Sequence, residues 1–503
     1  MKKKLLVILI TIVIGIITAS FYFFNKQTCH DCHLIVFDAD IFRADGLNCE
    51  ETPEITPNLC EIKDEFIRFN NHHSPTDLTK PGMASFLTSS YPATHGVWNE
   101  FFFLDKKQPN IVNVLKENKY HTIIHNFESS QVISNDYDQK IKDFNYYKAK
   151  EEGVESDYNP LDFIKNSPTF LFIYNGKLHY PYLSRNRDAI VDHPNKPEGF
   201  PNNEIDFEAD AEKILIQKYP EILQVPSIKE HIEKQNGLTK GIFGKFLKSC
   251  ASPDAEARVK NVKTCWKIMI DTFESYIDKD NPKYIEFIKY LYQERIRDLD
   301  KEIGKTIDDL KSRNLWNKTV FAVRSDHGEE FMEHNNLNHS NNLYQELVRV
   351  PFWVHIPNKK GVNINNLTQT IDEAPTLLNA LGIKPHPIMQ GRNLLNEKSY
   401  KGKTDLSLHQ KWFNNIFSIR EGNYKLIYME NPRPDQTKFE LFNLENDPEE
   451  KNNIVEENKE IRDKLFSKYY NIINRQPHFE AVSEVFGKLN QEQKNNLYLH
   501  GYF

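Results

Sequence analysis

The chain lacks a large excess of charge of either sign. Its 71 acidic and 64 basic side chains are mixed along 503 residues and give a formal net charge of −7. No face is therefore expected to neutralise a nucleic-acid backbone, and we expect no nucleic-acid partner. Internal repeats and low-complexity tracts are also missing. Aromatic residues make up 12% of the chain and charged residues 27%, which is typical of a packed globular enzyme rather than a disordered chain.

Long uncharged runs are missing as well, with one exception at the N-terminus. Lys2, Lys3 and Lys4 precede the uncharged run Leu5–Phe24, whose 20 residues would span about 30 Å as a helix. Residues 1–24 are thus predicted to be a transmembrane anchor or a signal segment. The anchor is favoured, because the only small-residue cleavage site is weak and bulky aromatic residues follow it. The positive-inside rule then places the remaining chain outside the cytoplasm, in the periplasm or at the cell surface.

Cysteine is scarce, with six residues. An exported chain permits disulfides, and the spacing indicates three local pairs: Cys29 with Cys32, Cys49 with Cys60, and Cys250 with Cys265. A second interpretation competes for the first pair. Cys29, Cys32 and His33 also match the C-x-x-C-H pattern of covalent haem attachment, so a disulfide and a haem both remain open there.

Short apolar runs recur along the first 400 residues. Leu34–Phe37 is continuous and uncharged, as in a strand that is buried on both faces of a parallel sheet. Similar runs occur at 122–124, 169–173, 319–323 and 351–354. Helical stretches lie between them, the clearest with apolar residues at helical spacing from Ile296 to Leu310. This alternation predicts an α/β domain over residues 34–400, built on a doubly wound, mostly parallel sheet.

Two further segments differ from this pattern. Residues from about 204 to 281 are lysine-rich and helical in pattern, and we interpret them as an insertion on the active-site side of the sheet. Residues 404–503 begin with short alternating strands and turn residues, which predict a small antiparallel C-terminal subdomain. The chain has room for both units, because single cores stop growing at roughly 250 to 300 residues.

Acidic residues and a histidine follow two of the predicted strands. Asp38 and Asp40 come at the end of the first strand, and Asp326 and His327 follow the run 319–323. The carboxyl ends of parallel strands meet at one edge of the sheet, where α/β folds place their ligands. A carboxylate beside an imidazole offers a divalent metal two ligands. An ordinary solvated loop is the alternative interpretation of the segment that begins with Asp326 and His327.

Thr79 precedes a predicted helix. Pro81 and Gly82 suit the first turn of that helix, so Thr79 would lie at its N-terminus. Backbone N–H groups and the helix dipole stabilise an anionic group there. An N-cap is the plain alternative for Thr79.

Several short motifs stand in one fixed order along the chain: DIFRAD at 40–45, TPNL at 56–59, LTKPGMASFLTS at 78–89, YPATHGV at 91–97, DHGE at 326–329, His339, LYQELVRVP at 343–351 and GRNLL at 391–395. The segments 424–428, 440–448 and 497–503 continue the series. Motifs of this kind in this order resemble the sulfatase family of the alkaline-phosphatase superfamily. The resemblance covers nearly everything after residue 34.

The resemblance implies an alkaline-phosphatase-like fold and an extracytoplasmic metallohydrolase that cleaves sulfate or phosphate esters. Thr79 would be the nucleophile. A divalent ion (Ca, Mg, Mn or Zn) would be bound by Asp326 and His327 together with Asp38 or Asp40. Family spacing favours Asp40 and strand position favours Asp38. One metal is better supported than two, because Asn175 stands where two-metal relatives need an aspartate.

Two further histidines acquire a role only through the resemblance. His179 and His339 are similar to family histidines that bind the transferred group or protonate the leaving oxygen. The substrate would be a small-molecule, glycan or lipid ester.

The chain also departs from the family pattern. Sulfatases that make formylglycine start from Cys or Ser, with Pro two residues later and Arg four residues later, whereas this chain has Thr79, Pro81 and Met83. Threonine cannot be oxidised to that aldehyde, and the missing arginine removes a sulfate contact. The family Gly-Lys-x-His motif is replaced near residues 125–128.

Threonine nucleophiles are familiar in phosphodiesterase, lipoteichoic-acid synthase and phosphoethanolamine-transferase relatives, so phosphoester or phosphodiester chemistry is favoured. Two alternatives stay open. One is a membrane-anchored transferase that moves a phosphoryl headgroup onto an envelope glycan. The other is a catalytically inactive binding protein.

Overall fold

The computed structural model describes residues 28–99, 102, 104, 105, 107–127, 145–148, 159–164, 167–183, 193–219, 267–339, 342–399, 406–411, 416–432 and 436–479. The predicted membrane segment at 1–24, the Cys250–Cys265 pair and the motif at 497–503 lie outside these residues. Among the residues that are described, no helix combines the length and the apolar character needed to cross a membrane.

The main sheet has eight strands within the described residues, in the order β11-β2-β10-β7-β1-β6-β4-β5. Its centre is parallel: β1 (His33–Ala39) pairs with β6 (Thr169–Asn175) and β7 (Thr319–Arg324), and β4 (His121–Phe127) pairs with β6 and with β5 (Asn145–Lys148). The apolar runs predicted as strands around 34, 122, 169 and 319 are confirmed. Their carboxyl ends meet at one edge of the sheet.

Strand β10 (Phe352–His355) also lies where an apolar run was predicted, but it runs antiparallel to both of its neighbours, β7 and β2 (Phe66–Phe69). The short strand β11 (Asn363–Ile364) pairs in parallel with β2. A run of buried apolar residues indicates a strand but carries no information about its direction. The expectation of a mostly parallel sheet therefore holds, with β10 as an antiparallel element.

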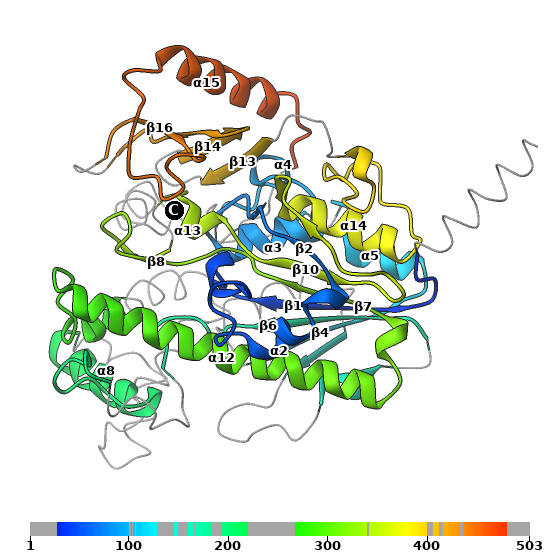
Figure 1. Cartoon of the computed structure of the whole chain (residues 1–503), viewed down its shortest axis with the longest axis horizontal. Helices are drawn as coiled ribbons and strands as arrows, with labels where there is room; N and C mark the ends of the chain where they lie inside the picture. The colour runs from blue at the N-terminus through cyan, green and yellow to red at the C-terminus, as the bar shows by residue number, and fades with distance from the viewer. Residues whose placement is uncertain are drawn as a thin grey trace, which may run out of the picture.

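Helices cover both faces of this sheet (Figure 1). The long helix α12 (Pro282–Ser312) and α2 (Pro57–Glu61) lie on one face, and α3 (Thr79–Thr88), α5 (Ile111–Glu117) and α14 (Glu373–Ala380) lie on the other. Strand β1 supplies both cores in alternation. Ile35 and Phe37 pack with α12, whereas Leu34 and Val36 pack beneath α3 and α14. A strand that is buried on both faces needs an uninterrupted apolar sequence, and the doubly wound architecture is confirmed.

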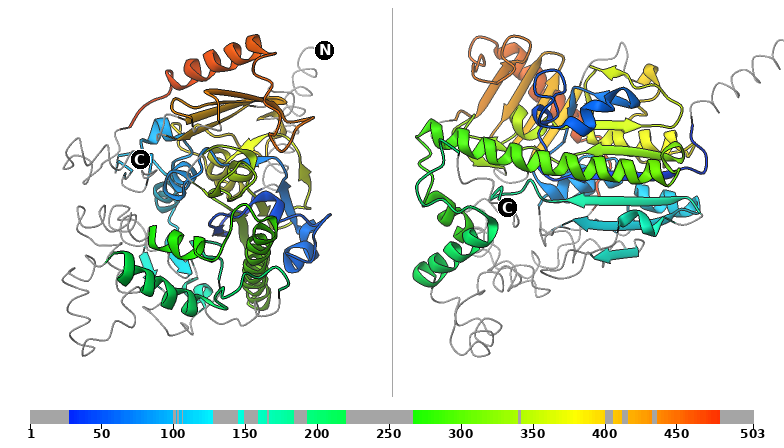
Figure 2. Two further views of the ribbon diagram at one scale, coloured as in Figure 1. Left: turned by 90° about the vertical axis from the view of Figure 1, so that its left-hand side faces the viewer. Right: turned by 60° about the horizontal axis from the view of Figure 1, so that its bottom comes forward.

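The C-terminal region forms a second, antiparallel sheet in the order β13-β14-β15-β16. Its strands are Leu406–Lys411, Ile416–Glu421, Tyr424–Tyr428 and Phe439–Asn443. Helix α15 (Lys459–Ile473) covers one face of this sheet (Figure 2), and the rings of Phe417 and Tyr469 stack there with centroids 3.6 Å apart. The predicted small antiparallel unit is confirmed. The described chain also contains 3-10 helices and these short elements: β3 (His72–His73), α4 (Pro92–His95), β8 (Glu330–Phe331), β9 (Leu337–Asn338), α13 (Gln345–Val348) and β12 (Thr368–Gln369).

Two of the predicted disulfides are present, Cys29–Cys32 and Cys49–Cys60. Because the first bond joins both sulfurs of the C-x-x-C-H motif, neither thiol is available for haem attachment. The His33 ring is buried and its Nδ1 accepts the backbone N–H of Thr169, which gives it a structural role. The disulfide interpretation of this motif is the one that the structure supports.

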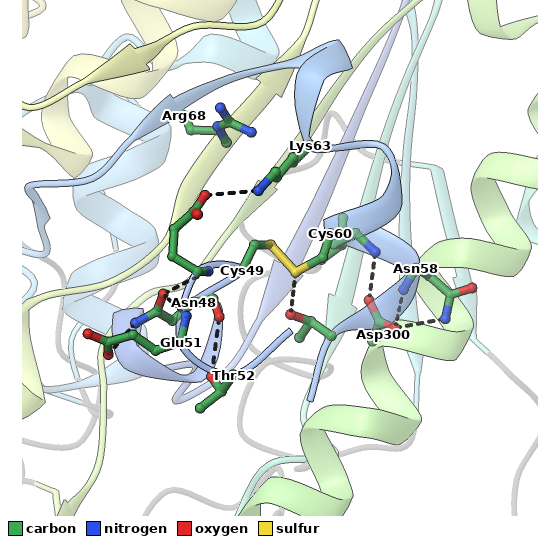
Figure 3. Close-up of a disulfide and its surroundings, with 12 residues drawn as sticks. Asn48, Cys49, Glu51, Thr52, Asn58, Cys60, Lys63, Arg68 and Asp300 are labelled. Atoms are coloured by element: carbon green, nitrogen blue, oxygen red, sulfur yellow. Dashed lines mark hydrogen bonds and ion pairs between the residues drawn. A yellow bond between two sulfur atoms is a disulfide. The ribbon is translucent and has the colours of Figure 1, made fainter. Parts of the chain in front are cut away.

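The second disulfide links α2 to the loop before it. Helix α2 also contacts α12 (Figure 3). Asp300 of α12 accepts hydrogen bonds from the backbone N–H groups of Asn58 and Leu59 and from the Asn58 side chain, at 2.7 to 3.0 Å. These donors belong to the first turn of α2, where N–H groups have no partner inside the helix. A carboxylate on the long helix thus caps the short one.

The described parts of the predicted insertion, 204–219 and 267–281, contain helix and turn but no strand. Helix α8 spans Glu204–Lys218, and a further helical segment covers 267–274. Tyr180, next to His179, contacts this segment through a hydrogen bond from its hydroxyl to the carbonyl of Met269 at 3.2 Å. The insertion therefore touches the loop that carries one of the candidate site residues.

Candidate active site

The candidate residues converge at the carboxyl ends of β1, β6 and β7. Asp40 follows β1 directly, and Asp326 and His327 follow β7. The backbone turns sharply after Asp40, because Ile41 has a φ of 53°, a left-handed conformation that a β-branched residue rarely adopts. The N–H of Ile41 donates to Asp326 Oδ1 at 3.2 Å, which holds this turn against the end of β7.

Asp40, Asp326 and His327 form a buried cluster whose ligand atoms lie within 4.8 Å of one another. His327 Nε2 is 3.6 Å from Asp40 Oδ1 and 3.8 Å from Asp326 Oδ2. Burial, together with the neighbouring Asp326 carboxylate, raises the pKa of Asp40 well above its usual value. Two carboxyl groups in one buried site repel each other when both are ionised, and a bound cation relieves that repulsion.

Two observations show that this cluster fits a divalent metal. His327 donates its Nδ1–H to the carbonyl of Gly328 at 2.8 Å, so the lone pair of Nε2 faces the two carboxylates. Asp326 Oδ2 is buried and accepts no hydrogen bond from the described residues. An orphaned carboxylate oxygen beside an imidazole lone pair and a second carboxylate is the ligand set of a small metal site.

Thr79 lies at this cluster. It is the first residue of α3, and Leu78 before it holds the N-cap position without a side-chain capping bond. The Thr79 hydroxyl donates to Asp40 Oδ1 at 3.4 Å and lies 3.2 Å from His327 Nε2. The hydroxyl is therefore directed at the candidate metal site and does not serve as a helix cap.

Asp38 lies outside the cluster, although strand position favoured it as a ligand. It occupies the face of β1 below α3, where it forms a buried ion pair with Arg324 of β7. Arg324 also contacts Glu373 of α14 at 2.6 Å, and Glu373 contacts His72 at 2.9 Å. Of the two aspartates, Asp40 is therefore the one that the structure places with Asp326 and His327. Arg324 balances the charge of Asp38, and no local sequence pattern predicted this pair.

His179 and His339 lie beside the cluster, with their rings in edge-to-face contact and the ring centroids 5.4 Å apart. The His339 ring is also 4.4 Å from that of His327. Burial, with a smaller contribution from His339, lowers the pKa of His179 to about 4, so this ring is neutral at physiological pH. Its Nδ1 lies 3.3 Å from the carbonyl of Tyr180.

Asn175, proposed as a poor substitute for a second metal ligand, is engaged elsewhere. Its side-chain amide donates to Glu302 of α12 at 2.8 Å, and Lys177 forms an ion pair with the same carboxylate. Arg295 of α12 donates to the carbonyl of Lys177 at 3.0 Å. The long helix thus holds the loop that carries His179. Among the described residues, the group of possible metal ligands beside Thr79 is Asp40, Asp326 and His327, and a second group is Glu330, His334 and Glu346.

Two residues of the site were not assigned a role from the sequence. The Tyr174 hydroxyl donates to Asp40 Oδ2 at 2.6 Å. Glu329, fully buried, accepts a hydrogen bond from Tyr182 at 2.8 Å and lies 3.0 Å from His339 Nδ1. A signal existed for both residues, because Tyr174 is the penultimate residue of β6, which pairs with β1, and Glu329 belongs to the D-H-G-E motif.

Besides Thr79, the residues that depart from the family pattern are Met83 and the segment 125–128. Met83, at the position of the family arginine, is buried in the core beneath α3. His125 on β4 is buried, and burial lowers its pKa to about 4. Glu128, in the segment that replaces the Gly-Lys-x-His motif, lies outside the described residues.

Comparisons with known proteins agree with this geometry. A family profile described as Sulfatase matches residues 33–383, and one described as N-sulphoglucosamine sulphohydrolase, C-terminal, matches residues 333–475. Arylsulfatase K of Homo sapiens is 27% identical over 246 residues, and the match covers 44% of this chain and 44% of that relative. The chain therefore aligns with less than half the length of this relative.

Solved structures share the fold at low sequence identity. A protein in complex with its substrate D-glucosamine-2-N,6-O-disulfate has a TM-score of 0.61 at 16% identity, covering 88% of this chain and 98% of that one. Phosphonate monoester hydrolase from Silicibacter pomeroyi has a TM-score of 0.60 at 14% identity, covering 92% and 98%. Since the first profile spans more than half of the sequence, the chain belongs to the sulfatase family.

Proposed function

We propose that the protein is a metal-dependent hydrolase of phosphate esters or diesters on the sulfatase scaffold, with Thr79 as its nucleophile. The observation that carries the proposal is the position of the Thr79 hydroxyl, 3.4 Å from Asp40 Oδ1 and 3.2 Å from His327 Nε2. A threonine that only capped a helix would have no reason to face two buried candidate metal ligands. The convergence of these groups with His179 and His339 supports an active enzyme rather than an inactive binding protein.

The candidate metal ligands are Asp40, Asp326 and His327. When bound there, a divalent ion would polarise the ester and favour the ionised form of a nearby hydroxyl. Asp40 Oδ1 accepts the hydrogen of the Thr79 hydroxyl, which directs an oxygen lone pair toward the substrate. The N-terminus of α3 stabilises negative charge that develops at the same place.

The reaction then proceeds in two displacements. As the Thr79 oxygen attacks phosphorus, its proton passes to Asp40 Oδ1, the bond to the alcohol oxygen breaks, and His339 donates the proton that the departing oxygen needs. In the second step, water attacks phosphorus, its proton passes to His339, and Thr79 Oγ1 takes its proton back from Asp40 and leaves as the hydroxyl.

The identity of the nucleophile supports phosphorus chemistry over sulfur chemistry. Threonine has a single hydroxyl and cannot form an aldehyde hydrate, so its ester must be cleaved by a second attack at the central atom. The buried methionine at position 83 further removes a charged contact for sulfate. A phosphonate monoester hydrolase among the fold neighbours supports phosphorus chemistry on this scaffold, whereas arylsulfatase K, among the relatives, favours sulfate esters.

The test is a screen of 4-nitrophenyl phosphate, bis(4-nitrophenyl) phosphate and 4-nitrophenyl sulfate with wild type, Thr79→Ala and Thr79→Ser. We expect phosphate-ester turnover that falls roughly a thousandfold or more in Thr79→Ala and is partly retained in Thr79→Ser. Equal turnover by wild type and Thr79→Ala would exclude Thr79 as the nucleophile. Turnover of the sulfate ester without turnover of either phosphate ester would contradict the proposed preference for phosphate esters. Release of inorganic phosphate without an acceptor distinguishes hydrolysis from headgroup transfer.

The compartment and the substrate class are part of the same proposal. The basic residues and the uncharged run at 1–24 support a membrane-anchored, extracytoplasmic enzyme that acts on a glycan or lipid ester. A neighbour in complex with a sulfated glucosamine supports a sugar ester as substrate. Fractionation of cells that express the full chain, followed by protease treatment of intact cells, tests the location of the enzyme.

A further inference from the structure

We propose that Glu329 is a positioning residue that fixes the ring of His339, so that Nδ1 carries a proton and Nε2 is the atom that exchanges a proton with the leaving oxygen. The inference rests on the proposed function, because it assigns His339 to the leaving group. It adds a residue whose role neither the family match nor the fold neighbours provide.

Each carboxylate oxygen of Glu329 has a different partner. Oε1 lies 3.0 Å from His339 Nδ1, and Oε2 accepts the Tyr182 hydroxyl at 2.8 Å. The Glu329 side chain is fully buried, whereas that of His339 retains 12% exposure. A buried carboxylate held from one side by a tyrosine and facing an imidazole on the other is the arrangement that orients a catalytic histidine.

The loop that carries Glu329 is itself held in place. Arg43 donates to the carbonyl oxygen of Glu329 at 2.9 Å and to Glu333 at 3.0 Å, and it forms a bidentate pair with Asp45. The Tyr182 ring packs against Tyr292 of α12 and against Phe331, with centroids 6.0 and 5.7 Å apart. Glu329 and its partner Tyr182 thus have few alternative positions.

The position of His339 relative to the metal cluster explains why its orientation matters. Its ring lies 4.4 Å from that of His327 and 5.4 Å from that of His179. With Nδ1 directed at Glu329, the opposite nitrogen is directed away from the carboxylate. In the doubly protonated ring, the proton on Nε2 would pass to the departing oxygen as the bond to phosphorus breaks and its electron pair stays on that oxygen, which leaves the neutral ring with its proton on Nδ1.

Glu329→Gln tests this role, because it keeps the shape of the side chain. Tyr182 continues to donate, so the glutamine carbonyl faces Tyr182 and the amide N–H groups face His339 Nδ1. Two donors then oppose each other, and the ring must place its proton on Nε2 or rotate. The neighbouring residue offers a matched control. Glu330 is also fully buried, but it accepts hydrogen bonds from the backbone N–H groups of His334 and Asn336 and from Asn342, outside this pair.

The kinetic readout is the dependence of kcat/KM on the leaving group across a series of substituted phenyl phosphates. We expect Glu329→Gln to lower kcat/KM about 10² to 10⁴-fold for phenyl phosphate, which needs the proton, and much less for 4-nitrophenyl phosphate. For Glu330→Gln, the slope of log kcat/KM plotted against the pKa of the leaving phenol should equal that of wild type. Equal loss for all leaving groups in Glu329→Gln, or an equal change of slope in Glu330→Gln, would overturn the inference.

A second measurement does not depend on turnover. In ¹⁵N-histidine-labelled protein with added Ca²⁺, the His339 signals, assigned through His339→Gln, should show the proton on Nδ1 in wild type and on Nε2 in Glu329→Gln. A wild-type ring with Nδ1 unprotonated contradicts the proposal even if Glu329→Gln proves unstable. Failure of the proposed function would show differently, as undiminished turnover in Thr79→Ala.

Discussion

The two oxygens of Asp40 have different partners. Oδ1 faces Thr79 and His327, whereas Oδ2 accepts the hydroxyl of Tyr174 at 2.6 Å. A ligand that is held through its second oxygen loses less conformational freedom when it binds a metal. Tyr174 is fully buried and extends from β6, so its hydroxyl has little freedom to move.

We therefore expect Tyr174→Phe to weaken the binding of a divalent ion about 10 to 100-fold, as measured by calorimetric titration of the protein with Mn²⁺ or Zn²⁺. Tyr120→Phe is the control, because that buried hydroxyl donates to the carbonyl of Cys32 at 2.9 Å, outside the site. Unchanged affinity in Tyr174→Phe, or equal weakening in both variants, would contradict this role of Tyr174.

Individual residues also show how far the sequence could predict the site. Thr79, Asp326 and His327 were placed from strand ends and a helix start, because local patterns determine those positions. Asp38 and Asp40 could not be separated, since the choice depends on Arg324 of β7, which pairs with Asp38 and is itself paired with Glu373 of α14. Such long-range charge pairing leaves no local pattern in the sequence.

At the scale of elements, α3 must approach the end of β7 closely to bring Thr79 to the cluster. A Cβ at Gly82 would lie 2.9 Å from the carbonyl oxygen of Asp326 and 3.3 Å from its Cβ. Both contacts are too short for a side chain to fit without movement. Glycine at this position therefore sets the distance between the nucleophile and the candidate metal ligands.

Gly82→Ala should displace α3 and lower kcat/KM on the order of a hundredfold, since a shift near 1 Å in a reacting group has an effect of this size. Helix propensity alone would favour alanine by about 1 kcal/mol, so a loss of activity would come from the displacement. Gly422→Ala is the control: that glycine has a φ of 61° with open space around it, so alanine there should lower stability without changing turnover. Wild-type kinetics in Gly82→Ala would show that α3 tolerates the methyl group.

The elements also differ in how well the sequence predicted them. The central strands were found because burial on both faces requires an unbroken apolar run. The direction of β10 was not found, because pairing between Phe352 and Arg324, far apart in sequence, determines it. Strand β2 was missed because Arg68 interrupts the apolar run of its four residues, Phe66–Phe69.

At the scale of the whole molecule, the second sheet is joined to the main domain by buried charged groups. Lys425 of β15 contacts Glu450 at 2.7 Å and donates to the carbonyl of Leu343 at 2.6 Å. Glu450 also accepts the backbone N–H of Gln345 at 2.6 Å. Gln345 begins α13, close in sequence to the loop with His339, so the second sheet supports one wall of the candidate site.

His334 is the titratable member of this junction. Its Nδ1 lies 2.6 Å from Glu346 and its Nε2 lies 3.1 Å from the carbonyl of Glu450. Burial alone would lower the pKa of His334, but the bond to Glu346 and the Glu450 carbonyl outweigh burial and raise it above its usual value. With acceptors at both ring nitrogens, the protonated ring is the form that fits the junction.

A histidine whose folded pKa is raised stabilises the fold fully at pH values below its unfolded pKa, about 6.5, and loses that contribution as the pH rises through the folded pKa. We expect the free energy of unfolding of His334→Gln to lie below that of wild type by about 1.5 to 3 kcal/mol near pH 6. The difference should shrink toward pH 9, as urea unfolding at each pH would measure. His386→Gln, at an exposed histidine outside the junction, controls for the loss of one histidine and should differ little from wild type at any pH. A His334→Gln deficit that stayed constant or grew with pH would mean that the neutral ring holds the two sheets together, and the charged contacts to Glu346 and Glu450 would then be incidental.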